Sequence, residues 1–326
     1  MNPTKADFEA LFEHRLDDQQ MREFLLSLPL NESTSASMIA TAAEVMRRHS
    51  IILEVPESLK SRLIDVVGTG GDKSGSFNVS STVAIVLAAS GAYVAKHGNR
   101  SITSKSGSAD VLEHLGIKLD LGLRESARLL EETGFTFLFA QYHHPAMKFI
   151  MPVRRSIPEK TVFNILGPLT NPVGLSKILL GVFDEVFVPK MAEAARELGM
   201  KSAIVVSSRE KMDEISISDI TYAGHLKNGN IEYFEIDPES HGIKKAPFAA
   251  ILGGEATENA RILTDILNNR ATDPQRDMVL INAAYALVAD GMARDAQEGL
   301  EIARDTLQSG KASEKLRQII AVSTRL

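Results

Sequence analysis

Two short stretches of this 326-residue chain combine glycine, hydroxyl and charged residues in patterns suited to holding an anion. The first, Gly68-Thr-Gly-Gly-Asp-Lys-Ser-Gly, lies between a short apolar run at 63–67 and a helical pattern that starts near Asn78. Glycines let the backbone approach a ligand closely, and a helix N-terminus presents free N–H groups and the positive end of the helix dipole. We therefore expect an anion site at this loop, most simply for phosphate.

The spacing of this loop excludes two common phosphate motifs. Lys73 stands where the third glycine of a dinucleotide-binding fingerprint would be, and no glycine directly precedes Lys73 as a Walker A loop requires. A tight turn with Asn78 as a simple helix cap is the alternative interpretation at this point.

The second stretch, Lys96-His-Gly-Asn-Arg-Ser, follows another predicted strand at 92–95. Lys96 can neutralise a phosphate, and the Asn99 amide can both donate and accept hydrogen bonds. The hydroxyl-rich segment 101–108 then leads to a second helix start near Ser108, so two helix N-termini would face one ligand with two anionic groups. The alternatives are an exposed polar loop with solvated Lys96 and Arg100, and a structural role for His97.

Three further groups could complete a site. Asp213 and Glu214 are adjacent carboxylates, the hard oxygen ligands that suit Mg²⁺ shared with phosphate, although such a pair can also be simply solvated. His143 and His144 follow a predicted strand, and their adjacency favours a substrate pocket over a zinc site. Arg154 can bind a carboxylate bidentately, unless it is an ordinary surface arginine.

The elements that must position these residues form an α/β pattern. Residues 1–62 show helical periodicity without a strand signal, and strands and helices alternate from Leu63 onward, which predicts βαβ units and a parallel sheet. Further strands are expected at 135–140, 177–183 and 203–206, and further helices at 109–115, 124–133 and 188–198. Residues 219–238 are expected to form an antiparallel pair that turns at 227–230. The chain is expected to be helical from about 258, with helices near 263–267, 277–289 and 294–308.

We expect a mostly parallel central sheet flanked by helices, plus a small all-helical domain built from two chain segments. The Pro-rich, basic stretch Met147–Pro172 interrupts the alternation and so is expected to return to the N-terminal helices. The predicted helical domain comprises residues 1–62 and about 147–176, and the larger domain comprises 63–146 and 177–326. The cleft between them is the expected ligand site.

Composition excludes several classes of protein. The chain has no cysteine, so disulfides and thiolate metal sites are excluded. Its net charge is −6 with interspersed signs, which argues against nucleic-acid binding. The N-terminus has no secretory pattern, and the longest apolar stretch, Val79–Ala95, is interrupted by polar residues, so we expect a cytoplasmic protein without membrane contact. No GxSxG motif is present, which disfavours a nucleophilic hydrolase.

Taken in order, these motifs resemble the anthranilate phosphoribosyltransferase family of tryptophan biosynthesis. The resemblance is carried by Gly68-Thr-Gly-Gly-Asp, Asn78-Val-Ser-Ser, Lys96-His-Gly-Asn-Arg-Ser, Lys105-Ser-Gly-Ser-Ala-Asp-Val-Leu-Glu, His144-Pro-Ala-Met-Lys, Pro152-Val-Arg-Arg, Phe163-Asn-Ile-Leu-Gly-Pro-Leu-Thr-Asn-Pro and Asp213-Glu. It is dense over residues 63–225 and looser at the ends.

The resemblance implies a Mg²⁺-dependent transferase that moves the phosphoribosyl group of phosphoribosyl pyrophosphate (PRPP) to the amine of anthranilate. It also implies two Mg²⁺ ions, a homodimer through the helical domain, and catalysis by positioning and electrostatics without a named catalytic residue. The implied PRPP residues are Gly68, Gly71, Asp72, Ser76, Asn78, Val79, Ser80, Ser81, Lys96, His97, Gly98, Asn99, Arg100, Ser101, Ile102, Thr103, Ser104 and Ser108. The implied anthranilate residues are Gly68, His97, Asn99, His144, Arg154 and Pro168, and the implied metal residues are Ser80, Asp213 and Glu214.

The sequence departs from the family pattern at a few positions. Ser76 and Ser81 replace threonine and keep the hydroxyl, whereas Gln141 and Pro158-Glu-Lys change the edge of the acceptor pocket. A pyrimidine nucleoside phosphorylase-like enzyme and a non-catalytic nucleic-acid-binding relative are the rival functions. The lysine turn disfavours the first, and the acidic balance disfavours the second.

Overall fold

The structure is a computed structural model that describes residues 3–101 and 105–326. Its centre is a seven-stranded sheet in the order β3-β2-β1-β4-β5-β6-β7. The strands are β1 (Leu63–Gly68), β2 (Tyr93–Gly98), β3 (Phe135–Phe139), β4 (Lys177–Gly181), β5 (Ser202–Ser208), β6 (Thr221–Lys227) and β7 (Asn230–Ile236). The strands from β3 to β5 are parallel, and β6 and β7 add an antiparallel edge. The predicted mostly parallel α/β fold is confirmed.

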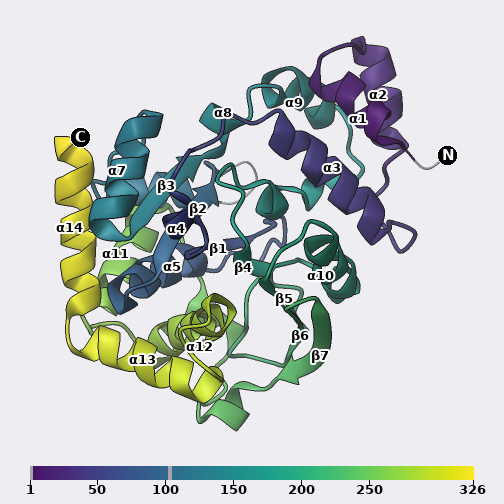
Figure 1. Ribbon diagram of the computed structural model, residues 1–326. Helices are drawn as coiled ribbons and strands as arrows, with labels where there is room; N and C mark the ends of the chain where they lie inside the picture. The colour runs from purple at the N-terminus through teal and green to yellow at the C-terminus, as the bar shows by residue number, and fades with distance from the viewer. Residues whose placement is uncertain (1–2, 102–104) are drawn as a thin grey trace.

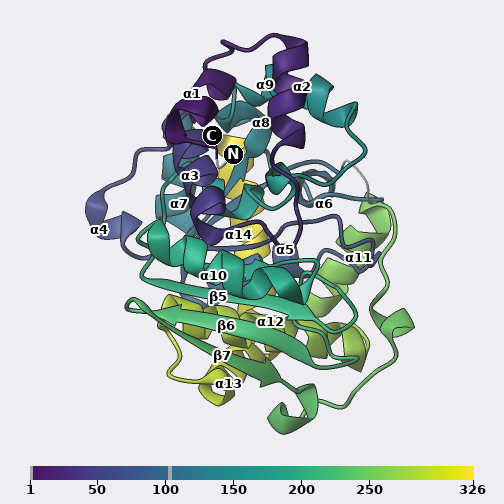
Figure 2. The ribbon, with the colours of Figure 1, turned by 90° about the vertical axis from the view of Figure 1, so that its right-hand side faces the viewer.

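Helices cover both faces of this sheet, and other helices gather at one end of the molecule (Figures 1 and 2). They are α1 (Lys5–Phe12), α2 (Asp18–Leu26), α3 (Ala36–Arg48), α4 (Glu57–Lys60), α5 (Val79–Ser90), α6 (Ser108–His114), α7 (Leu123–Thr133), α8 (Ala140–His143), α9 (Met147–Arg155), α10 (Val188–Glu197), α11 (Ala256–Leu267), α12 (Asp273–Asp290), α13 (Ala296–Gln308) and α14 (Lys311–Arg325). Within the described ranges, none of the helices is long and apolar enough to cross a membrane.

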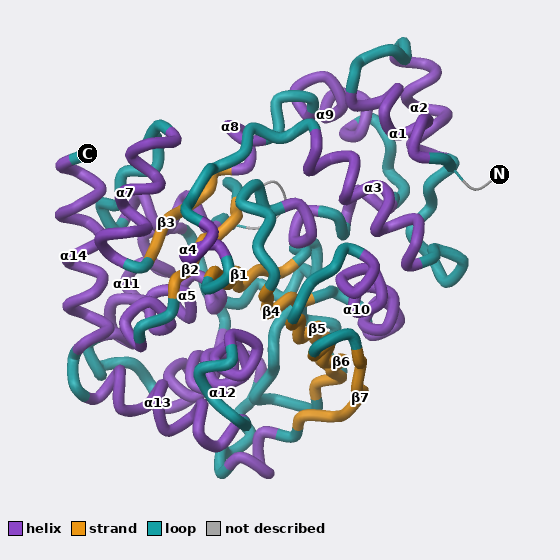
Figure 3. Tube along the Cα trace, in the orientation of Figure 1, coloured by secondary structure: helices purple, strands orange, loops and turns teal. Residues whose placement is uncertain are grey.

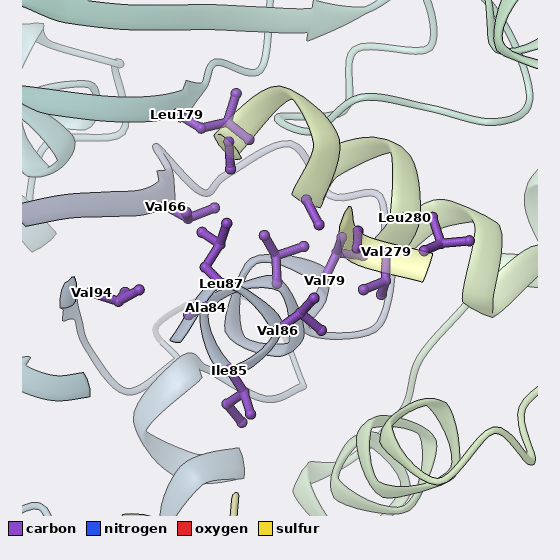
Figure 4. Close-up of a cluster of buried hydrophobic side chains, with 14 of the residues drawn as sticks. Val66, Val79, Ala84, Ile85, Val86, Leu87, Val94, Leu179, Val279 and Leu280 are labelled. Carbon is purple, nitrogen blue, oxygen red and sulfur yellow. The ribbon is translucent and has the colours of Figure 1, made fainter. Parts of the chain in front are cut away.

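Alternate side chains of each central strand enter two different hydrophobic cores. Ile204 and Val206 of β5 pack with α5 and α12, whereas Ala203 and Val205 face the core that contains α3 and α10. This alternation follows from the pleat of a strand, and burial on both faces explains why the parallel strands are mostly apolar in sequence. Figure 4 shows the first core, where α5 side chains meet Val66 of β1, Leu179 of β4 and Val279 of α12.

The N-terminal helices lie beside a much later stretch of the chain. Helices α1, α2, α3 and α9 gather at one end of the molecule (Figures 1 and 3). Pro29 forms an antiparallel bridge with Thr161, and the Val162 N–H donates to the Leu28 carbonyl at 3.0 Å. The Pro-rich stretch therefore does return to the N-terminal helices. The exact domain boundaries stay a proposal.

The C-terminal region is helical, as predicted from about residue 258. Helix α11 begins at Ala256, before the helix predicted near 263–267, and the terminal helix α14 was not predicted separately. Helix α14 packs against α5 and α7, so its apolar side belongs to the main core. Its buried residues recur every three or four positions (Ala312, Leu316, Ile319), which is the signal that could have found it.

Candidate active site

The carboxyl ends of β1 and β4 meet at paired glycines. Gly68 lies opposite Gly181 in the register of the two strands. A Cβ atom added at Gly68 would lie 2.2 Å from Asp213 Oδ2, and one added at Gly181 would lie 1.6 Å from the Asp213 carbonyl oxygen. These two glycines therefore let the acidic loop after β5 approach the ends of β1 and β4, a position where open α/β sheets bind ligands.

The two predicted metal carboxylates contact the glycine loop and helix α5. The Gly70 N–H donates to Asp213 Oδ2 at 2.7 Å, and the Ser80 N–H donates to Glu214 Oε1 at 3.4 Å. Ser80 lies in the first turn of α5, whose N-terminus carries a positive partial charge. The structure thus brings together all three residues predicted to hold Mg²⁺.

Crowding of carboxylates makes this a fitting place for a cation. Burial raises the pKa of Asp213 to about 7, with a further contribution from the nearby Asp72, and burial also raises the pKa of Glu214 well above its ordinary value. Within the described chain, Glu214 Oε2 is buried without a hydrogen-bond partner. A hard divalent cation would satisfy that oxygen and relieve the repulsion, so the donor set fits Mg²⁺.

Lys96 is buried beside Ser80 and the two carboxylates. Its side chain is 1% exposed, and Nζ donates to the Val66 carbonyl at 2.6 Å and to Ser80 Oγ at 3.3 Å. Burial lowers the pKa of Lys96, and the carboxylates of Asp65 and Glu214 oppose that effect. The Lys96 ammonium group therefore links the first turn of α5 to β1 inside the protein.

Asp65 and Asn171 form a buried link that the sequence did not reveal. Asp65 accepts hydrogen bonds from the His97 N–H at 3.2 Å and from Asn171 Nδ2 at 2.9 Å. Asn171 Nδ2 also donates to the Ala95 carbonyl at 2.8 Å. The link joins β1 and β2 to the segment that follows α9. A lone Asp in an apolar strand and an Asn before Pro172 were the available signals.

The two predicted pocket histidines contact each other. His97 Nε2 and His144 Nε2 are 3.2 Å apart, and both side chains are at most 5% exposed. Burial lowers the pKa of His144 to about 4 and that of His97 well below its ordinary value, with His143 and His144 adding to the effect. Both imidazoles are therefore neutral near pH 7. Pro168, the third predicted pocket residue, is buried in a short helical turn, Gly167–Thr170.

Arg154 is a half-buried arginine in the last turn of α9. Its Nη2 donates to the Phe163 carbonyl at 3.3 Å, and its guanidinium lies 5.5 Å from the centre of the Phe163 ring. Burial lowers the pKa of Arg154 to about 10, and Arg154 makes no salt bridge to any described residue. A half-buried cation without an anion nearby suits a carboxylate ligand.

The turn after β2 is fixed mainly by α6. Asn99 accepts from Gln141 Nε2 at 3.3 Å, and Ser108 Oγ donates to the Asn99 carbonyl at 3.3 Å. The Arg100 side chain, predicted at the PRPP site, pairs with Asp110 at 3.0 Å. Gly98 allows close packing, because a Cβ there would lie 2.3 Å from Ser108 Oγ. The Ser101 N–H donates to Asp110, and Ile102, Thr103 and Ser104 lie outside the described residues.

The segment 252–259 lies against the glycine loop and the start of α5, a contact that no sequence motif predicted. Gly71 has a φ of +76°, Asp72 caps the Ser74 N–H at 3.3 Å, and Ser76 bridges to Leu252. The Asn78 side chain does not cap α5 but accepts from Asn259 Nδ2 at 2.8 Å. Asn259 also accepts the Gly254 N–H at 2.8 Å, so it joins two loops at the site.

Two predicted PRPP residues point away from the loop. Val79 and Ser81 are fully buried, and Ser81 Oγ has no hydrogen-bond partner among the residues that the structure describes. Adjacent positions of a helix lie on different faces, so Ser80 faces the carboxylates while its neighbours face the core. Val79 and Ser81 therefore present only their backbone groups, and not their side chains, at the start of α5.

The fold and this site define a glycosyltransferase of the α/β type. Residues 60–313 match the model of the glycosyl transferase family, a/b domain. The anthranilate phosphoribosyltransferase of Xanthobacter autotrophicus is 42% identical over 98% of this chain and 91% of its own length. The chain belongs to the anthranilate phosphoribosyltransferase family.

Solved structures agree with this membership. The anthranilate phosphoribosyltransferase of Thermus thermophilus superposes with a TM-score of 0.92 at 35% identity, covering 99% of this chain and 97% of that one. The Saccharomyces cerevisiae protein in complex with PRPP and Mg gives 0.89 at 28% identity, covering 99% and 94%. Its complex with 4-fluoroanthranilate gives 0.87 at 26% identity, with the same coverage.

Proposed function

We propose that this protein transfers the phosphoribosyl group of PRPP to the amine of anthranilate, giving N-(5-phosphoribosyl)anthranilate and pyrophosphate. The observation that carries the proposal is the meeting of the Asp213–Glu214 pair with the glycine loop and the Ser80 N–H at the start of α5. Carboxylates that suit a cation lie here beside N–H groups that suit an anion, which supports binding of a metal-chelated pyrophosphate. The family of the chain supports the same reaction.

The donor side of the site would hold PRPP through the glycine loop, the start of α5 and the turn after β2. Ser80, Asp213 and Glu214 would hold Mg²⁺, and we propose two ions with PRPP bound. Bound Mg²⁺ would neutralise charge on the departing pyrophosphate. The chain contributes backbone N–H groups at the N-terminus of α5, which favour the same negative charge.

The acceptor side would bind anthranilate beside the segment 163–170. Arg154 would bind its carboxylate, while His97, His144, Asn99, Gly68 and Pro168 would surround the ring and the amine. An aromatic amine is a nucleophile in its neutral form, so it needs orientation more than deprotonation. The neutral state of both histidines agrees with a positioning role, since neither adds a positive charge next to the ribose cation that develops.

We further propose that the protein is a cytoplasmic homodimer that associates through its helical segments. Ile52 and Tyr142 are each 53% exposed, and Phe149 on α9 is 49% exposed. The Ile51 N–H donates to the His143 carbonyl at 2.8 Å, which places the Ile51–Ile52 loop beside α8. Large apolar side chains exposed near one another are typical of a protein interface.

The test is a fluorescence assay with purified protein, PRPP, MgCl₂ and anthranilate. We expect anthranilate fluorescence to fall only when PRPP and Mg²⁺ are both present, and to remain constant with the Asp213→Asn/Glu214→Gln double variant. Ser323→Ala, which removes a buried hydroxyl far along the chain in α14, is the control and should keep activity.

Two results would overturn the proposal. Absence of PRPP binding to the wild-type protein would exclude PRPP as the donor. Binding of PRPP without consumption of anthranilate, together with turnover of a pyrimidine nucleoside and phosphate, would favour the phosphorylase reaction instead.

A further inference from the structure

The loop that carries the two metal carboxylates is fixed on both sides. Before the pair, the Met212 N–H donates to Ser208 Oγ at 3.1 Å, and the Ser208 N–H donates to the Met212 carbonyl at 3.0 Å. After the pair, the Ile215 N–H donates to Asn282 Oδ1 at 3.0 Å, and Asn282 Nδ2 donates to the Ile215 carbonyl at 2.8 Å. The dipeptide Asp213–Glu214 is thus held between two pairs of hydrogen bonds.

The two anchors differ in where they come from. Ser208 ends β5, the strand that leads into the loop, so its bonds are local. Asn282 lies on α12, far along the chain, and its side chain is 3% exposed. It is the polar member of a buried apolar run, Met278–Leu287. A buried amide in such a helix is unfavourable unless its hydrogen bonds are satisfied, and here they are satisfied by the metal loop and the Met278 carbonyl.

Helix α12 also packs against the element that presents the donors for phosphate. Its residues Val279 and Leu280 share a core with α5 and with Val66 of β1 (Figure 4). Asn282 itself lines the same small hollow as Ser80, Asp213 and Glu214. A single rigid helix therefore sets the metal loop relative to the N-terminus of α5.

We propose that Asn282 is a positioning residue, which holds Asp213 and Glu214 at the distance from α5 that binding of Mg²⁺ and PRPP together requires. It acts through the Ile215 backbone and touches no reacting atom. This inference rests on the proposed metal-dependent function. Partners that orient metal ligands typically affect metal affinity by ten- to hundredfold.

The test measures binding without turnover. Calorimetric titrations of PRPP, without anthranilate, at increasing MgCl₂ give the Mg²⁺ concentration at which PRPP affinity is half-maximal. We expect Asn282→Leu, which has similar size but no hydrogen bonds, to raise that concentration by about tenfold or more. Because leucine suits an apolar helix, the variant should fold, and circular dichroism checks this. Asn282→Ser, too short to reach both Ile215 groups, is the second variant and should shift in the same direction.

Ser323→Ala is the matched control. Ser323 is fully buried and accepts the Lys118 N–H at 3.1 Å, so its loss removes a comparable long-range bond outside the site. It should lower the melting temperature and leave the Mg²⁺ dependence unchanged. An unchanged Mg²⁺ dependence in a folded Asn282 variant would overturn the proposed role of Asn282 and leave the proposed function standing. PRPP binding by the wild-type protein that needs no Mg²⁺ would also overturn this inference, whereas absence of PRPP binding at every Mg²⁺ concentration would overturn the proposed function.

Discussion

At the scale of single residues, the site separates cations that already have partners from cations that do not. Lys96 is bonded inside the protein and Arg100 is paired with α6, whereas Arg154 makes no salt bridge within the described chain. Since a half-buried guanidinium is stabilised most by an anion, Arg154 is the residue most suited to an incoming carboxylate.

Replacing Arg154 should therefore affect the acceptor and spare the donor. We expect Arg154→Gln to raise the KM for anthranilate by about ten- to hundredfold, since a hydrogen bond to a charged group contributes about 1.5–3 kcal/mol. The KM for PRPP should stay within about twofold. Steady-state kinetics with each substrate varied checks both values, and Arg155→Gln, one residue along and exposed, is the control. An equal rise in both KM values would contradict the assignment.

The histidine pair makes a prediction about stability and pH. The pKa of His144 is about 4 in the folded protein against 6.5 ordinarily, mainly because of burial. The unfolded chain then binds more protons as pH falls below 6.5, so this contribution to stability is lost progressively from that pH toward 4. Between pH 7 and pH 5, the free energy of unfolding should fall by about 2 kcal/mol more in the wild-type protein than in His144→Gln.

Urea unfolding at both pH values measures this difference. The exposed His114→Gln variant is the control and should lose stability as the wild-type protein does. His97 contributes with the same sign in all three proteins, because its pKa is lowered too. Parallel pH profiles for wild type and His144→Gln would show that His144 is not a buried neutral group.

At the scale of elements, the site depends on how closely the ends of β1 and β4 approach the acidic loop. A side chain at Gly181 would overlap the Asp213 backbone, so β4 or the loop would have to move. We expect Gly181→Ala to cost about 1–3 kcal/mol of unfolding free energy and to remove most activity.

Gly167→Ala is the matched control for this prediction. A Cβ there meets nothing within 4 Å, so its unfolding free energy should stay near the wild-type value. Denaturant titration of both variants gives the comparison. A Gly181→Ala protein with wild-type stability would mean that the close approach of the two segments is not needed.

At the scale of the whole molecule, exposed apolar side chains distinguish the two ends. Ile52 follows Ile51, which bonds to His143 of α8, whereas Leu123, also exposed, lies on α7, which packs against α14. Figure 1 shows α7 and α14 at the opposite end of the molecule from α1, α2 and α3. We expect Ile52→Glu to convert the proposed dimer into a monomer, because a buried carboxylate at an interface is strongly unfavourable. Leu123→Glu adds the same charge and should leave the dimer intact.

Sedimentation equilibrium reads out the mass of each variant directly. A wild-type protein that sediments as a monomer would refute the dimer. A dimer that persists in Ile52→Glu would place the interface elsewhere.

From the amino-acid sequence alone, the order of the elements and the motifs of the proposed donor site could be predicted. The glycine loop, the start of α5 and the Asp213–Glu214 pair were predicted because each motif is local: spacing, glycine content and hydroxyl density express its chemistry within a few residues. The parallel sheet followed from alternating strand and helix patterns, and the contact of residues 147–172 with the N-terminal helices followed from the break in that alternation.

The polar residues that hold these motifs together could be identified only in the folded protein. Asp65 and Asn282 lie in apolar segments, Asn171 lies in a motif that indicated no such bond, and these residues and Asn259 bond to partners distant in sequence. A single buried amide has the same local appearance whether it anchors a functional loop or an ordinary turn. Likewise, Arg100 could be assigned to α6 only after packing had placed Asp110 beside it, because pairing across a fold is set by geometry that no local pattern records.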